Sequence, residues 1–288
     1  MKKRLLTGAV CLSLAGMTML TACSGKESAK KGNVELEILL ADDTLEGGAM
    51  KAVVEKFNEE HKDQGVTAFV NEIAYADMET QIKNRAKAGN LPAICKMSNF
   101  DTYIDYVLPL DDTSLDPDNF NRSGVRNGKL YGTDVNDTAV GMVINKTAFD
   151  EAGVSYPTTS EERWTWDEFS AAVKEVAEKN EKITTPFVID HSQQRSGTVL
   201  YQFGMKYFDP NDSTKVTFRS EDTKKGVEFF LDMFKEGGIS KASIGTGAEN
   251  AQDVFKTGTV AAHMAGNWVI SDYTQNIKDF EWTPVLMP

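Results

Sequence analysis

The sequence predicts an α/β protein of two lobes, each built on a mostly parallel sheet flanked by helices. Strand-like and helix-like segments alternate as βαβαβ over residues 34–97, which favours parallel strands joined by right-handed crossovers. A similar alternation restarts beyond a short connecting segment at 135–144. The 288 residues also exceed the usual size of one domain. We therefore expect an N-terminal lobe over 33–134 and a C-terminal lobe over 145–288.

The first lobe is expected to hold three strands separated by two helices. An apolar stripe at helical spacing predicts the first helix. Asp77 is the predicted N-cap of the second helix, which Gly89 ends. Three short apolar runs bounded by turn residues predict the strands. The strands are 34–40, 66–73 and 93–97, and the stripe is Met50, Val53, Val54 and Phe57.

In the second lobe the clearest local signal is a capping box, in which the side chains of Thr165 and Glu168 satisfy free amides of a first helical turn. A later helix over 222–235 is expected to turn four apolar residues inward. These four are Val227, Phe230, Leu231 and Phe234. Further predicted helices are 148–152, 198–207 and 250–256, and predicted strands are 139–144, 186–189, 259–264 and 280–287.

Residues 1–22 have the pattern of a signal peptide, with a basic start, an apolar run and a cysteine directly after it. The four residues that end at Cys23, LTAC, resemble a lipobox. We expect cleavage before Cys23, acylation of its thiol with groups such as palmitate, and a polar linker over 23–32. The alternative is a single membrane-spanning anchor. The first interpretation places the protein on the extracytoplasmic face of the cell membrane, anchored by lipid.

Charge and cysteine usage exclude several classes of protein. The chain has 31 basic and 43 acidic side chains, and binding to nucleic acid needs clustered basic residues, so we expect no nucleic-acid partner. Cys11 leaves with the leader and Cys23 is acylated, so Cys95 has no disulfide partner and is expected to be a buried strand thiol. The three histidines lack a second ligand at metal spacing, so no metal and no cofactor are expected. His263 is interpreted as a core residue.

No catalytic motif stands out. The sequence has no nucleophile elbow, no HExxH pair and no P-loop. Carboxylate pairs of the kind that hydrolyse glycosides are expected by chance among 43 acidic residues. We therefore predict that the chain is not an enzyme, with an exported carbohydrate-active enzyme kept as the alternative.

Four segments together are more specific than any one of them: GKLYG at 128–132, INKTAFDEAG at 144–153, WTWDEF at 164–169 and VFKTGTVAAHMAGNW at 254–268. In the sequence and order of these motifs, the chain resembles the family 1 extracellular solute-binding proteins, the ligand receptors of ABC importers. The resemblance implies a maltose-binding-protein-like fold, the two-lobe periplasmic-binding-protein type II, with 135–144 as the hinge and crossing strand. It covers about 33–288, and the family's C-terminal return segment is expected to be missing, as in a shortened gene product or fragment.

The resemblance also implies the function. A receptor of this family would capture a carbohydrate, most simply an oligosaccharide, in the cleft between the lobes and deliver it to an ABC permease by hinge closure. We expect a monomer whose other partner is the membrane that holds its lipid anchor. A polyamine or another small solute is the alternative ligand, and a structural surface lipoprotein without a ligand is a further alternative.

Candidate ligand-binding residues come from strand ends and from the resemblance. Ligands of parallel α/β sheets bind beyond the carboxyl ends of the strands, where this chain carries acids, amides and tyrosines. Sugars need an aromatic face and polar hydrogen-bonding groups, and the resemblance implies that Trp268 stacks on a sugar ring. The predicted ligand-binding residues are Asp42, Asp43, Tyr75, Asn99, Asp101, Asp134, Asn136, Thr138, Tyr201, Asn267 and Trp268.

Overall fold

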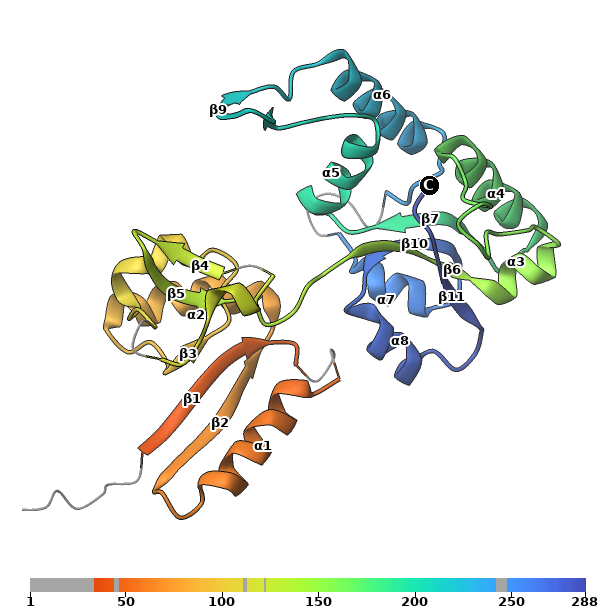
Figure 1. Ribbon diagram of the computed structural model, residues 1–288. Coiled ribbons are helices and arrows are strands. Elements are labelled where there is room, and N and C mark those ends of the chain that lie inside the picture. Colours follow the sequence, from red (N-terminus) through yellow and green to blue (C-terminus); the bar gives the residue numbers. More distant parts are fainter. Residues whose placement is uncertain (1–33, 44–46, 111–112, 122, 242–247) are drawn as a thin grey trace, which may run out of the picture.

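The computed structural model describes residues 34–43, 47–110, 113–121, 123–241 and 248–288. These form two lobes, and in Figure 1 the chain passes from one to the other through the segment ahead of β6. The predicted signal peptide, Cys23 and the 23–32 linker lie outside the described residues. Among the helices that the structure describes, none is both long and apolar enough to cross a membrane.

The first lobe is built on a three-stranded sheet in the order β2-β1-β3. Both neighbours of β1 (Val34–Ala41) run parallel to it, namely β2 (Val66–Ile73) and β3 (Ile94–Cys95). The connections are α1 (Ala49–His61) and α2 (Tyr75–Ala88), so the predicted βαβαβ order is confirmed. All three strands therefore present their carboxyl ends at one edge.

Two details of the first lobe differ from the prediction. Val53 is 61% exposed, because the inward face of α1 is centred on Val54, with Met50 and Phe57 partly buried beside it. Asp77 is not the N-cap of α2, since the helix already begins at Tyr75 and Asp77 lies in its first turn.

The rest of the first lobe is short elements. A hairpin pairs β4 (Ser123–Arg126) with β5 (Lys129–Thr133) through a turn at Asn127 and Gly128, whose φ angles of 51° and 75° are both left-handed. Two 3₁₀ helices, η1 (Phe100–Tyr106) and η2 (Pro117–Asn119), precede it.

The second lobe has a four-stranded sheet in the order β11-β6-β10-β7. Its members are β11 (Trp282–Val285), β6 (Val140–Asn145), β10 (Val260–Gly266) and β7 (Thr185–Ile189). β6 runs antiparallel to both of its neighbours, while β7, β10 and β11 share one direction. Two of the three strand pairings are therefore antiparallel, so the sheet is mixed, which corrects the prediction of a mostly parallel sheet, and the strand that enters from the first lobe is the reversed one.

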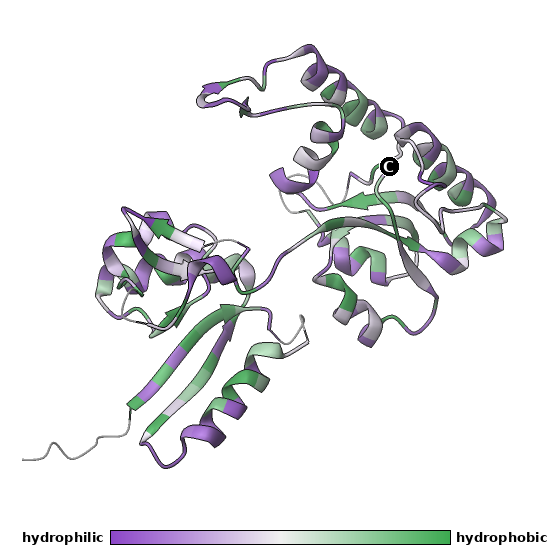
Figure 2. Cartoon of the chain, viewed as in Figure 1, coloured by the Kyte–Doolittle hydropathy of each residue, from purple (hydrophilic) through white to green (hydrophobic). Residues whose placement is uncertain are grey.

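Helices cover both faces of this sheet. One core packs the sheet against α4 (Trp166–Lys179) and α6 (Glu221–Lys235), and the other packs it against α7 (Ala251–Lys256) and α8 (Val269–Asn276). All seven residues of β10 are consequently buried. Figure 2 shows the hydrophilic residues of α4 and α6 turned outward. The remaining elements are α3 (Lys146–Ala152), α5 (Gln193–Gln202), β8 (Phe208–Asp209) and β9 (Asp212–Val216).

The capping box is confirmed, with the Thr165 amide 2.7 Å from Glu168 Oε2. The predicted inward face of α6 is wrong in part, because Val227 and Leu231 are 39% and 48% exposed. The cause is Gly226, whose missing side chain lets α6 approach α5: a Cβ there would lie 3.0 Å from Leu200 Cδ2. The helix over 198–207 was also misplaced, since α5 begins at Gln193 after its cap.

Candidate ligand-binding site

Three strand ends of the second lobe meet at one edge of its sheet. Gly266, the last residue of β10, pairs with Val140, the first residue of β6, and Met264 pairs with Ile189, the last residue of β7. The hinge, the residue after β7 and the residues after β10 are therefore brought together. This is the edge at which α/β sheets bind their ligands.

Trp268 lies at this edge, half-buried, at the start of α8. Its indole occupies the space beside Gly266, where a Cβ would come within 1.6 Å of Cζ3, so only glycine fits under the ring. The guanidinium of Arg195 lies over the indole, with Cζ 4.4 Å from the ring centroid. This is a cation–π contact, which holds the ring in one orientation.

Arg195 is supplied by the first turn of α5, where the Ser192 hydroxyl accepts its amide hydrogen. The residue is only 7% exposed, and its Nε lies 3.3 Å from Oδ2 of Asp190, the residue that follows β7. The contact is an ion pair without a well-aligned hydrogen bond. Burial lowers the pKa of Arg195 and raises that of Asp190, and each charge partly offsets the other's shift. Neither residue is among the predicted ligand-binding residues.

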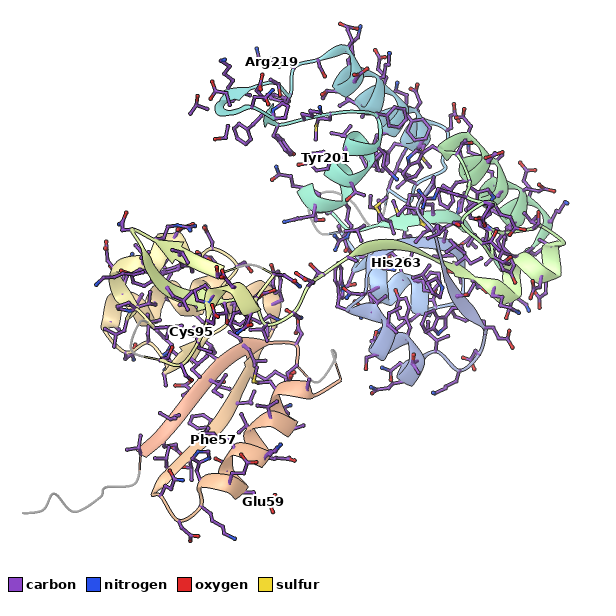
Figure 3. All side chains as sticks on the ribbon, viewed as in Figure 1. Phe57, Glu59, Cys95, Tyr201, Arg219 and His263 are labelled. Carbon is purple, nitrogen blue, oxygen red and sulfur yellow. The ribbon has the colours of Figure 1, made fainter. Side chains whose placement is uncertain are left out.

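His263 lies inside the same sheet, in β10, and is labelled in Figure 3. Its Nδ1 is 2.6 Å from the Tyr273 hydroxyl, and its Nε2 is buried without a hydrogen-bond partner. Burial, with the charge of Arg195, lowers the His263 pKa to about 3, so the imidazole is neutral. The prediction of a core histidine is confirmed.

Asn267 is hydrogen-bonded to the segment that was predicted to be the hinge. Its backbone amide donates to the Ala139 carbonyl at 3.0 Å, its Oδ1 accepts from the Ala139 amide at 3.2 Å, and its Nδ2 donates to the Asp137 carbonyl at 3.2 Å. Because both ends of the side-chain amide are engaged, we withdraw Asn267 from the candidate site.

The other predicted hinge residues lie along the same segment. Asp134 is half-buried, and its Oδ1 is buried without a hydrogen-bond partner. Asn136 and Thr138 are exposed. Between them, the Asp137 carboxylate accepts from Asn121 Nδ2 at 2.7 Å, which ties the segment to the first lobe.

Two predicted residues of the first lobe are committed to local structure. The Asp43 carboxylate is buried and accepts the amides of Met50 and Lys51, at 2.9 and 3.1 Å, at the start of α1. Asp101 binds Arg126 through two contacts of 2.5 and 2.7 Å, which lower the pKa of Asp101. We leave both out of the candidate site.

The remaining predicted residues are more accessible. Tyr75 is 65% exposed at the start of α2, and Asn99 is exposed ahead of η1. Asp42 is half-buried with a left-handed φ of 58°. Tyr201 is exposed on α5, where Figure 3 places it, with its ring edge-on to Tyr207 at 5.7 Å.

Cys95 lies in β3, as predicted, but it is half-buried where full burial was expected. Burial raises its thiol pKa to about 11.

Comparison with known proteins identifies the family of this chain. Residues 41–287 match the family model described as bacterial extracellular solute-binding protein. The chain belongs to this family. Membership in a family of binding proteins agrees with the prediction that the chain is not an enzyme. A curated relative, the arabinooligosaccharide-binding protein of Halalkalibacterium halodurans, is 23% identical over 250 residues. The match covers 82% of this chain and 54% of the relative, so the solute-binding chain spans about half of that relative's length.

Solved structures confirm the predicted fold. The GacH receptor of Streptomyces glaucescens, determined unliganded and with acarbose, superposes with a TM-score of 0.73 at 20% identity, covering 89% of this chain and 67% of that one. The substrate-binding protein Lmo0181 from Listeria monocytogenes, solved with cycloalternan, gives a TM-score of 0.72 at 21% identity, covering 88% and 66%. At these identities the likeness establishes the two-lobe type II fold.

Proposed function

We propose that this solute-binding protein is the receptor of an ABC importer that captures an oligosaccharide between its lobes and delivers it to the permease. The observation that carries the proposal is the half-buried Trp268 indole at the carboxyl edge of the second sheet, with polar Asp190 and Arg195 beside it. The half-buried indole gives an apolar surface beside hydrogen-bonding groups, a combination that suits a sugar ring. The acarbose and cycloalternan complexes of the two solved structures, and the name of the curated relative, support the same class of ligand.

Ligand capture would proceed by hinge closure about the segment that precedes β6. A ligand that contacts both lobes favours the closed state by its differential affinity for that state. The second lobe would contribute Trp268, and the first lobe and hinge would contribute polar residues. Those residues are Asp42, Tyr75, Asn99, Asp134, Asn136 and Thr138, with Tyr201 on α5.

The proposal includes a monomer tethered to the extracytoplasmic face of the membrane by acyl groups on Cys23. In a Cys23→Ala variant expressed in its cell, the protein should leave the membrane fraction or remain an uncleaved precursor. Normal processing and unchanged membrane partition would contradict the anchor without affecting the ligand proposal.

A thermal-shift screen tests the ligand class. We expect arabinotriose, maltotriose or raffinose to raise the melting temperature, whereas spermidine should not, because Arg195 places a positive charge against the indole. A ligand at 100 times its Kd stabilises the folded state by about 2.7 kcal/mol. Chromatography of the same samples should recover the sugar intact. Stabilisation by spermidine alone would contradict the carbohydrate proposal, and cleavage of the sugar would contradict the receptor.

A further inference from the structure

We propose that Asp190 and Arg195, together with the Trp268 indole, form a subsite that selects an uncharged sugar unit through two neighbouring hydroxyl groups. Arg195 would donate hydrogen bonds to one hydroxyl oxygen, and Asp190 would accept a hydrogen bond from the other hydroxyl. The inference rests on the proposed function and adds to it two specificity-determining residues that the sequence did not point to.

Arg195 is held in place by its neighbours. Arg195 is only 7% exposed as a residue, so its charge carries a large desolvation cost, which the Asp190 carboxylate offsets at 3.3 Å. The indole of Trp268 covers it from another direction. An arginine placed in this way at a ligand-binding edge is a pre-organised donor, since its rotamer is fixed before a ligand arrives.

The two Nη groups of Arg195 remain as hydrogen-bond donors. Nε faces Asp190, and in the part of the chain that the structure describes the two Nη groups have no hydrogen-bond partner. They are not among the fully buried unsatisfied atoms, so solvent reaches them. The Asp190 side chain is 32% exposed, which leaves lone pairs of its carboxylate accessible. The pair therefore offers donors and acceptors side by side.

A hydroxyl group both donates and accepts a hydrogen bond, so two adjacent sugar hydroxyls match a neighbouring donor and acceptor. The apolar face of the same sugar ring would rest near the indole. Hydrogen bonds to charged groups contribute about 1.5–3 kcal/mol each, which makes such a pair a strong determinant of specificity.

The Asp190–Arg195 pair favours an uncharged ligand. Asp190 already compensates Arg195, so a ligand carboxylate at this position would meet a second carboxylate in a chain whose net charge is −12. A ligand cation would meet the guanidinium. Either charge would be repelled by one member of the pair, whereas a neutral ring would be repelled by neither.

The test is isothermal titration of the whole protein with four probes: arabinotriose, maltotriose, raffinose and trigalacturonate. Variants Arg195→Met and Asp190→Asn should each weaken the tightest neutral probe by about 10- to 100-fold. The double variant leaves no buried charge unpaired, so it should fold and lose affinity by a similar factor. Arg219→Met replaces an exposed arginine and serves as the matched control (Figure 3).

The Arg195→Lys variant distinguishes two roles of Arg195: donating hydrogen bonds to the ligand, or only positioning the Trp268 indole. Lysine keeps a positive charge near the indole but lacks the planar fork, so the donor role predicts a remaining loss of five-fold or more. Full recovery by lysine would contradict it. Unchanged affinity in Arg195→Met, or tighter binding of trigalacturonate than of every neutral probe, would overturn the subsite while leaving the receptor proposal standing. Failure of all four probes to bind the wild type would contradict both.

Discussion

The two lobes use the polar residues at their strand ends in different ways. In the first lobe, Asp43 and Asp101 are engaged by the start of α1 and by Arg126. In the second, Asp190 and Arg195 are paired with each other beside Trp268 and keep accessible donors and acceptors. The position of a residue at a strand end is therefore a weak guide to ligand binding. What distinguishes a candidate is whether local structure already uses its hydrogen-bonding groups.

The lobes also differ in how their sheets are buried. Every residue of β10 is buried between two apolar cores, whereas β1 is buried only over its last four residues, 38–41. The first lobe adds a polar cross-link, in which Arg85 binds both carboxylate oxygens of Glu37 at 2.6 Å. The second lobe thus has the more deeply buried sheet, and all four tryptophans of the chain lie in this lobe. Tryptophan fluorescence consequently reports the unfolding of the second lobe, while circular dichroism reports the unfolding of both lobes.

The largest expected effect on stability comes from truncating a core side chain in the second lobe. Phe187 is fully buried in β7 and packs edge-to-face on Phe169 at 5.1 Å, so Phe187→Ala should cost about 3–5 kcal/mol of unfolding free energy. In urea, the fluorescence midpoint should fall while a dichroism component from the first lobe stays in place. If both signals move together by the same amount, the lobes unfold as one unit and the comparison fails.

The Glu37–Arg85 contact makes the stability of the first lobe depend on pH. Arg85 lowers the pKa of Glu37 below its ordinary value of 4.5, so the contact stabilises the fold above that pH and is lost as pH falls through the folded pKa. Glu37→Gln should cost about 1–2 kcal/mol at pH 7 and progressively less below about pH 4.5. Dichroism melts at several pH values measure this, with the exposed Glu35→Gln as control. A cost that is independent of pH would contradict the ionic contribution.

A smaller effect tests the hinge. Asn267→Ala removes two hydrogen bonds that join the second lobe to the Asp137–Ala139 backbone. Because the contacts are solvent-exposed, the cost in stability should be about 1 kcal/mol, yet small-angle scattering should show a wider range of interlobe distances. An unchanged scattering profile would show that these bonds do not restrain the hinge.

The smallest effect contrasts two neighbours on α1. Val53→Ala should change the unfolding free energy by less than about 0.5 kcal/mol, because the side chain is exposed. Val54→Ala, at a buried position, should cost about 1–2 kcal/mol by the loss of two buried methyl groups. Equal costs for both would mean that α1 docks in a different rotation.

The sequence was sufficient for the features that depend on local patterns. Apolar alternation located most strands, and the Thr165–Glu168 signature located the start of α4, because caps and periodicity are properties of a few adjacent residues. The inward face of α6 was not predictable in this way, since it is set by Gly226, which carries no apolar side chain. Asp190 directly follows a predicted strand, so the rule applied to the first lobe would have found it. The burial of Arg195 arises only when α5 meets the residues after β10.

The most direct test of the central claim, that the second lobe presents Trp268 to an oligosaccharide, is Trp268→Ala with titration and melting measured on the same samples. We predict a loss of affinity for the tightest neutral probe of about 30- to 1000-fold, with the melting transition retained. Trp282→Ala is the contrasting control, because that ring packs in the core against Tyr273 at 5.6 Å and should lower the melting temperature without changing the Kd. Unaltered affinity in Trp268→Ala, or a collapse of its melting transition like that expected for a core residue, would contradict the account.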